Sequence, residues 1–333
     1  MRHQYLERAT GSVVTEHFFG DQLVRFLYGR AREKAPWLLR AAASPFASEL
    51  GALLAFDSPF LPGLIGSGRF LRHFRIPWAE CLEPAEALRT PRQIFERKIR
   101  YWSCRPLPAD LSAVVSPADS RVMVGSLEDG SLLEIKHKLF ELPELLGERG
   151  PWVEAFSRGD FAIFRLTPEQ YHWNHTPVAG RVLARYEVAG SCHSCHPVAT
   201  LEAPSLLSKN RRTVTVFDTD VDGGSGVGRV AMVEVVALLI GEVVQAYSTV
   251  RYDDPRPLEA GQLAFRGRPK SLFRPGSSTV VLLFEPGRIQ FAPDLEANRL
   301  RTDVESVFSR GGGRPVVETA IQVRSLLATR RES

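Results

Sequence analysis

The sequence predicts an α+β protein with a helical N-terminal region followed by a mostly antiparallel β core. Apolar residues repeat at helical spacing within the first 105 residues, and short β-rich runs separated by turn residues begin near Ser112. Few of these runs are separated by segments of helix length, which favours antiparallel strands over a doubly wound sheet. We therefore expect a helical region over residues 1–105, a β-rich core over 106–290 and a loosely attached C-terminal tail over 291–333.

The helical interpretation of the N-terminal region depends on Phe19, Leu23, Phe26 and Leu27, which share one helical face. Residues 1–40 also hold seven Arg or Lys against four acidic residues. One interpretation is a helix that packs on the core and exposes a basic face. The other is a helix that contacts a membrane, which a second aromatic and basic patch at residues 68–78 favours.

The composition is typical of a soluble globular protein, with 44% hydrophobic and 24% charged residues. The net charge of +4 is too small to indicate a nucleic-acid partner, although a local basic surface could meet anionic lipid. The most apolar stretch, residues 230–244, carries Glu234 and Glu242 and is too short to span a membrane. The first residues do not form a secretion signal. We expect a cytoplasmic protein, or one attached to the inner surface of a membrane.

The β-rich region contains five such runs, at residues 113–137, 161–170, 180–190, 212–226 and 228–252. Within the fourth run, residues 218–226 read DTDVDGGSG and imitate a calcium-binding loop. The imitation fails at the twelfth position, where Arg229 replaces the required glutamate. We interpret this segment as an acidic hairpin turn.

Four cysteines, Cys81, Cys104, Cys192 and Cys195, are expected to be reduced in a chain without an export signal. The segment CHSCH (192–196) has the spacing of covalent haem attachment, and a Cys/His metal site is a second alternative. Haem attachment of this kind usually accompanies export. We therefore interpret these residues as ordinary loop and core residues, and we predict no metal.

Three further motifs contain candidate chemistry. His172 and His175, in YHWNHTP, follow a strand-like run and suit acid–base work, although such a pair is more often structural. Asp119 lies in a turn between two β-like runs. Ser277 and Ser278, after Pro and Gly, precede the apolar run at 280–284. That pattern fits a turn that opens a buried strand, and it also fits a site of backbone chemistry.

Taken in order, four segments resemble the motifs of the phosphatidylserine decarboxylase family: SPADSRV around Asp119, FRLTPEQYHWNHTPVAGRV, KNRRTV (209–214) and PGSSTVVLLFEPG. The stretch TPRQIFERKIRYWSCRPLP (90–108) is similar to the family's segment ahead of its aspartate. The N-terminal region is similar to that of the longer-chained branch. The resemblance extends from about residue 10 to 290.

The resemblance implies decarboxylation of phosphatidylserine to phosphatidylethanolamine by a pyruvoyl group that the protein makes from its own serine. The pyruvoyl carbonyl condenses with the substrate amine and accepts the electrons released with CO2. To form it, a serine hydroxyl attacks the preceding carbonyl, and elimination then cuts the chain into two. The implied roles are Ser278 as pyruvoyl precursor, His175 as its base, Asp119 as the residue that orients His175, and His172 beside the substrate.

The sequence departs from the family pattern at two positions. Ser277 replaces the glycine before the pyruvoyl serine, and Trp173 replaces an arginine after the first histidine. An alignment without gaps predicts cleavage at Ser277–Ser278. The alternative bond, Gly276–Ser277, would make Ser277 the pyruvoyl precursor and requires a one-residue bulge.

The resemblance also implies partners and a location. The partners are phosphatidylserine, an anionic membrane surface, a second copy in a homodimer, and the chain's own α and β fragments. The location is peripheral, on the cytoplasmic face of the cell membrane. Two other functions remain open at this point: a lipid-binding homologue that does not cleave itself, and a decarboxylase of another amine-bearing substrate.

Overall fold

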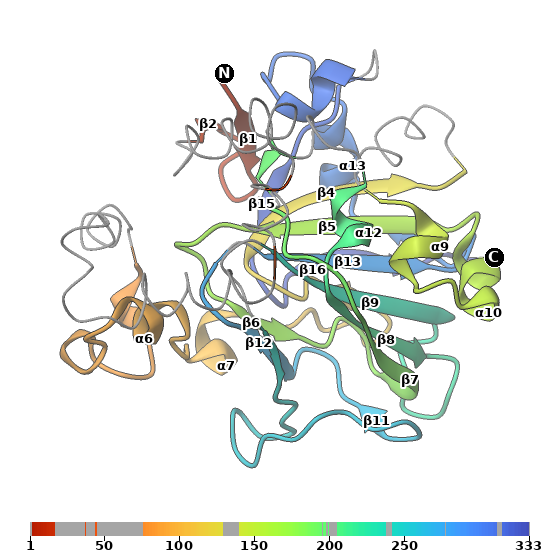
Figure 1. The fold of residues 1–333 in the computed structure, drawn as a ribbon, viewed down its shortest axis with the longest axis horizontal. Coiled ribbons are helices and arrows are strands. Elements are labelled where there is room, and N and C mark those ends of the chain that lie inside the picture. Colours follow the sequence, from red (N-terminus) through yellow and green to blue (C-terminus); the bar gives the residue numbers. More distant parts are fainter. Residues whose placement is uncertain are drawn as a thin grey trace.

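The computed structural model describes residues 2–16, 37, 44, 76–128, 140–194, 196, 197, 199, 205–237, 242–276, 278–311 and 315–332. These residues form a mixed α+β fold, most of it strands gathered around one large sheet (Figure 1). Most of residues 17–75 lie outside this description, as do Cys195 and Ser277. Among the helices that are described, none has the length and apolar character needed to cross a membrane.

The large sheet has ten strands in the order β11-β7-β8-β9-β13-β5-β4-β15-β1-β2. All neighbouring pairs among these described strands are antiparallel except β1 and β15, which run parallel. Their bounds are β1 Gln4–Glu7, β2 Val13–Thr15, β4 Ser120–Ser126, β5 Asp160–Leu166, β7 Gly180–Val188, β8 Arg212–Asp218, β9 Arg229–Val236, β11 Leu263–Ala264, β13 Ser278–Phe284 and β15 Thr319–Ile321.

Strand β13 lies near the middle of this sheet, between β9 and β5. All seven of its residues are buried, because both faces of the sheet are covered, and this explains its unbroken apolar run. Val280 and Leu282 belong to the core on one face, while Val281 and Leu283 belong to the core on the other. Since side chains alternate along a strand, Ser278 faces the same side as Val280.

Two three-stranded sheets complete the β structure. The first, β10-β12-β6, comprises Val243–Gln245, Pro269–Phe273 and Trp173–His175. The second, β14-β16-β3, comprises Ile289–Phe291, Leu326–Arg330 and Val114–Val115. Phe273 of β12 packs in the same core as Val280. The first small sheet therefore lies over the face of the large sheet to which Ser278 points.

The helices are short and lie around the sheets. They are η3 Trp78–Glu80, η4 Ala85–Ala87, α6 Pro91–Phe95, α7 Tyr101–Cys104, α9 Leu142–Leu145, α10 Gly150–Phe156, α12 Leu206–Lys209, α13 Pro293–Arg299 and η6 Val307–Gly311. Helix α6 begins with a capping box between Thr90 and Gln93, which satisfies free N–H groups at its first turn. In Figure 1, α6 and α7 lie on the side of the molecule that holds β6 and β12, and α9 and α10 lie on the other side.

The structure corrects the expected ends of the chain. Residues 4–15 were predicted to be helical, but they form β1 and β2, because β1 pairs with β15 from the far end of the sequence. For the same reason residues 291–333 are not a loose tail: β15 lies inside the large sheet, between β4 and β1. The predicted acidic hairpin is confirmed, since β8 and β9 are antiparallel neighbours joined by residues 219–228.

Candidate active site

His172 lies just before β6, fully buried, with its ring stacked on Phe95 at 3.6 Å between ring centroids. Its Nδ1 donates to the carbonyl of Gln170 at 2.9 Å. The lone pair is therefore on Nε2, which has no hydrogen-bond partner among the described residues. Burial, reinforced by the nearby charge of Arg97, holds the pKa of His172 well below its usual value. The ring is neutral, with one buried acceptor available to a ligand.

His175 is also fully buried, at the end of β6. Its Nδ1 donates to the carbonyl of Gly267 at 2.9 Å, which leaves Nε2 to accept from the Tyr171 hydroxyl, also at 2.9 Å. The Tyr171 hydroxyl lies 2.8 Å from that of Tyr252. Burial, with the charges of Arg324 and other arginines, lowers the pKa of His175 to about 3. His175 is therefore a neutral acceptor at the end of a short chain of hydroxyl groups.

The Asp119 carboxylate does not contact the His175 ring in the described structure. It accepts two hydrogen bonds from Arg105, at 3.2 and 3.0 Å, and one from the Val323 amide at 2.8 Å. The turn that carries Asp119 nevertheless touches His175, because the His175 amide donates to the Pro117 carbonyl at 2.7 Å. The structure thus brings the aspartate turn and the histidine together through the backbone, with Arg105 holding the carboxylate.

Ser278 is the first residue of β13, opposite Leu166 of β5 and Val236 of β9. It is completely buried, and its hydroxyl has no hydrogen-bond partner among the described residues. Two residues earlier, Gly276 adopts a φ of 149°, a conformation that favours glycine. Gly276 thus has a conformation suited to a turn, directly ahead of the fully buried strand β13.

His172 and Ser278 lie on two segments, residues 166–172 and 273–278, that are paired with each other. Ser278 pairs with Leu166 at one end, and at the other end the Phe273 amide donates to the His172 carbonyl at 3.1 Å. Residues 166–172 and 273–278 are consequently held against each other at both ends. Each segment carries one buried polar atom without a partner, which is unusual in a folded protein and typical of atoms that bind a ligand or react.

The chain after α6 contacts both of these segments. The Trp173 indole donates to the Glu96 carbonyl at 3.1 Å, and the Glu96 carboxylate pairs with Arg274 at 2.9 Å. Trp173 thus connects the start of β6 to the segment that follows α6. This contact accounts for a tryptophan at the position where the family resemblance implies an arginine.

A buried polar cluster lies beside the site and has no sequence signal that could have identified it. Lys270 Nζ donates to Glu234 at 2.6 Å, with both side chains fully buried. Burial lowers the pKa of Lys270. A bulge at Lys270 turns both it and Ser271 toward Glu234, which also accepts from Asn174 at 3.2 Å. Asn174 lies between His172 and His175 in the sequence. Its bond to Glu234 therefore helps to hold strand β6 in position.

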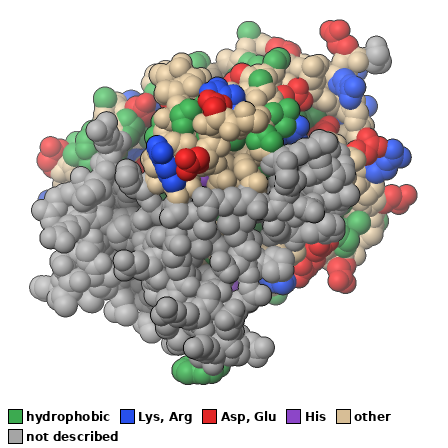
Figure 2. All heavy atoms as spheres, turned by 90° about the horizontal axis from the view of Figure 1, so that it is seen from above, with side chains coloured by type: hydrophobic (Ala, Val, Ile, Leu, Met, Phe, Trp, Pro, Cys, Tyr) green, Lys and Arg blue, Asp and Glu red, His purple; other side chains and the backbone are tan. Residues whose placement is uncertain are grey.

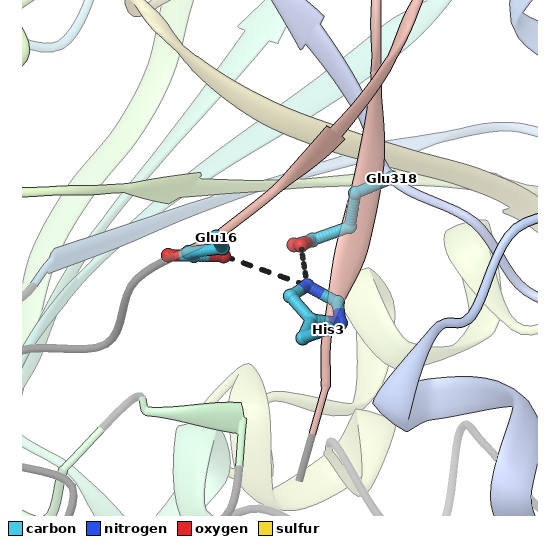
Figure 3. A group of neighbouring side chains, drawn as sticks. All are labelled: His3, Glu16 and Glu318. Atoms are coloured by element: carbon cyan, nitrogen blue, oxygen red, sulfur yellow. Dashed lines mark hydrogen bonds and ion pairs between the residues drawn. The ribbon is translucent and has the colours of Figure 1, made fainter.

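His3, Glu16 and Glu318 form the one group among the described residues with the geometry of a metal site. His3 Nε2 lies 2.9 Å from Glu318 and 3.5 Å from Glu16, as Figure 3 shows. Both carboxylates are already paired with Arg165, at 2.6 and 2.7 Å. The cluster is therefore an ion-pair network that holds the two ends of the chain against β5.

The CHSCH segment is described only in part. Cys192 is buried against Val236, and the His193 amide donates to Asn210 at 2.7 Å. Cys195 lies outside the described residues.

Comparisons with known proteins identify the family. A sequence profile described as phosphatidylserine decarboxylase matches residues 92–305, more than half of the chain. The chain is 31% identical over 294 residues to a phosphatidylserine decarboxylase proenzyme of Chlamydia trachomatis serovar L2, covering 87% of this chain and 90% of that protein. It is 28% identical over 316 residues to the proenzyme of Chlamydia pneumoniae, covering 93% and 97%. The proenzyme of Bordetella petrii is 32% identical over 234 residues, 67% of this chain and 78% of that protein.

These matches define a carboxy-lyase whose pyruvoyl group is made from the chain itself. More narrowly, the chain belongs to the phosphatidylserine decarboxylase family, and its activity is decarboxylation of phosphatidylserine. The predicted family, activity and cofactor are confirmed.

Proposed function

We propose that Ser278 is the residue that becomes the pyruvoyl group, by attack of its hydroxyl on the carbonyl of Ser277. The observation that supports this most strongly is the buried Ser278 hydroxyl without a partner, at the mouth of β13. A hydroxyl that bonds to none of the described residues is free to approach the preceding carbonyl. The conformation of Gly276 supports the tight turn that such an approach requires.

The attack forms an ester between the Ser278 side chain and the Ser277 carbonyl, and the Ser278 amide nitrogen becomes an amine. Loss of the Cα proton and elimination of the Ser277 carboxylate then cut the chain. The dehydroalanine left at residue 278 isomerises to an imine, and water converts this to a ketone with release of ammonia. No outside oxidant is needed, because the carbonyl arises by elimination and hydrolysis.

His175 is the base in this proposal: its ring is neutral, and the Nε2 lone pair that now accepts from the Tyr171 hydroxyl is the one that would take the proton. Asp119 supports it indirectly. Its carboxylate neutralises Arg105, whose positive charge otherwise disfavours a proton on His175. This role differs from the direct orientation of the ring that the family resemblance implies.

His172 is proposed to act on the substrate. Its Nε2 is a buried acceptor on the segment that faces the cleavage turn. When the pyruvoyl carbonyl has condensed with the substrate amine and CO2 has left, a proton must reach the former α carbon. A neutral histidine next to that position can take and return protons.

The location and assembly remain proposals. We place the protein at the inner surface of the membrane, bound through the basic and aromatic sequence of residues 1–40 and 68–78, with 106–290 as the catalytic core. The excess of Arg and Lys over acidic residues in residues 1–40 supports this assignment. On the face drawn in Figure 2, basic and acidic side chains of the described residues are interspersed. A homodimer is proposed from the family resemblance, and light scattering of the purified protein would test it.

Paired serine variants test the assignment of the pyruvoyl precursor. Ser278→Ala should abolish cleavage, because alanine has no hydroxyl to attack the preceding carbonyl. Ser277→Ala should keep it, and Ser277→Gly should be cut at least as fast, since glycine relieves crowding at the bond. Gel electrophoresis of each purified chain measures the result. Cleavage of Ser278→Ala together with an uncut Ser277→Ala would assign the reaction to Ser277 instead.

A further inference from the structure

Arg97 is a buried arginine without an acidic partner among the described residues. Arg97 comes two residues after the end of α6, and only 3% of the residue is exposed. Nη1 and Nη2 donate to the carbonyls of Ile94 and Glu169, at 3.0 and 2.8 Å, and Nε has no partner. A charge removed from water in this way is costly unless an anion joins it.

Three other buried arginines, Arg165, Arg105 and Arg212, have more partners than Arg97. Arg165 pairs with two carboxylates, and so does Arg105. Arg212 has no carboxylate partner either, but all three of its nitrogens donate to backbone carbonyls. Arg324 also has an unpaired Nε and no acidic partner among the described residues, but its Nη1 donates to the Tyr101 carbonyl at 3.1 Å and its guanidinium lies over the Tyr101 ring at 4.8 Å. Arg97 has its unused donor on the segment that contacts His172.

Three contacts fix Arg97 beside His172. Phe95 stacks on the His172 ring, the Glu96 carbonyl accepts from Trp173, and Arg97 itself binds the Glu169 carbonyl. Residues 95–97 and 169–173 are therefore held side by side. The two atoms without a partner, Nε of Arg97 and Nε2 of His172, therefore lie on two segments that contact each other.

We propose that Arg97 binds the phosphodiester of the phospholipid head group, in a site shared with His172. This rests on the proposed role of His172 at the substrate. A guanidinium forms strong charge-assisted hydrogen bonds with phosphate oxygens. The Trp173 indole donates to the Glu96 carbonyl, which holds the residue next to Arg97 in that part of the site.

The substrate offers two anionic groups, and their chemistry separates them. The carboxylate must lose its charge as CO2, so a strong ion pair to it would stabilise the ground state and slow the reaction. The phosphodiester keeps its charge from substrate to product. Arg97 is therefore assigned to the group that binds equally before and after decarboxylation.

Arg97→Gln is the direct test, with Arg212→Gln as a matched control that removes another buried guanidinium bound to backbone carbonyls. Mature Arg97→Gln should show a KM for phosphatidylserine raised by about tenfold to a hundredfold, with kcat within about twofold. Inhibition by glycerophosphoethanolamine, which has the phosphodiester and no carboxylate, should weaken by the same factor. Arg212→Gln should leave both constants unchanged.

Arg97→Lys is measured in parallel, because glutamine removes two backbone hydrogen bonds. Lysine keeps the charge without the planar fork and should raise KM by several-fold. An unchanged KM in a mature Arg97→Gln enzyme would overturn the proposal. A raised KM with unchanged inhibition by glycerophosphoethanolamine would assign Arg97 to the carboxylate and also overturn it.

Failure of both variants to mature would make Arg97 a structural residue, which is a third contradicting result. The role of His172 is tested separately, because His172→Ala is expected to change kcat. The two proposals can therefore fail independently.

Discussion

Three buried polar atoms near the cleavage turn have no hydrogen-bond partner among the described residues: Ser278 Oγ, His172 Nε2 and Asn174 Oδ1. Leaving such an atom unpaired costs roughly 1–3 kcal/mol of stability. All three lie on β13, on β6 or directly before β6. Their cost to folding is consistent with bonds that form during maturation or substrate binding.

The two histidines should separate into different functions when each is replaced. His175→Ala should leave the chain uncut, because it removes the neutral Nε2 that is proposed to take the serine proton, and the Nε2 of His172 is assigned to the substrate. His172→Ala should mature but decarboxylate about a hundredfold more slowly, since its proposed work is on the substrate. The measurements are the fraction of cut chain and kcat of the mature enzyme. Normal maturation of His175→Ala would remove it as the base.

At the residue scale, sequence reasoning identified the groups but missed what surrounds them. Asp119, His172, His175 and Ser278 could be singled out from motifs alone. Their partners could not be, because Arg105 and the carbonyl of Gly267 become neighbours only through the fold. The direct contact implied between Asp119 and His175 is absent from the described structure for this reason.

At the scale of elements, β1 and β15 show why long-range pairing is difficult to predict. Neither strand has more than four residues, and they meet across nearly the whole length of the chain. The periodicity of apolar residues within each strand cannot predict a partner so distant in the sequence. By contrast, the hairpin of β8 and β9 was predictable because its turn residues lie between two neighbouring runs. Glu234 and Lys270 were missed because single charges in strands usually indicate a solvent-exposed face.

The ion-pair network around Arg165 should hold these end strands in place. Arg165→Gln leaves Glu16 and Glu318 buried without their main partner, and it should lower the free energy of unfolding by about 3–5 kcal/mol. Urea denaturation measures the change, in a Ser278→Ala background that keeps the chain whole.

Arg158→Gln is the matched control for that experiment. Arg158 pairs with Glu128 at the surface, with side chains 74% and 52% exposed. Its replacement should change stability by less than about 0.5 kcal/mol. Equal effects of the two substitutions would show that the buried network does not hold the chain ends.

At the scale of the whole molecule, membrane binding should depend on the basic N-terminal sequence. Deleting residues 1–40 would also remove β1, so neutralisation is the cleaner change. Replacing Arg25, Arg30, Arg32 and Lys34 with glutamine should weaken binding to phosphatidylserine-containing vesicles by tenfold or more. High salt should weaken the unaltered protein in the same way. Vesicle sedimentation measures both effects.

Arg256→Gln serves as the control for vesicle binding, since its side chain is 76% exposed in the described part of the chain. It should bind vesicles as the unaltered protein does. Unchanged binding after the four N-terminal substitutions would contradict membrane contact by this segment and favour the alternative, a helix that packs on the core and exposes a basic face.

The overall class was accessible from the sequence because turn residues and β-rich runs alternate along most of the chain. The way in which the small sheets pack on the large sheet could not be predicted from the sequence. Nothing local indicates that β10-β12-β6 covers the face to which Ser278 points, yet this arrangement brings His172 against the segment that leads into β13. The site is therefore a product of the whole fold, assembled from motifs that each have an ordinary alternative interpretation.

The most direct test of self-cleavage at Ser278 is the intact mass of the purified wild-type protein. We predict a long chain that ends at Ser277 and a short chain of residues 278–333 whose first residue is a pyruvoyl group. The short chain should resist Edman degradation and react with hydrazines, because it carries a ketone in place of an amine. A short chain that begins at residue 277, or a single uncut chain of 37.1 kDa, would contradict this account.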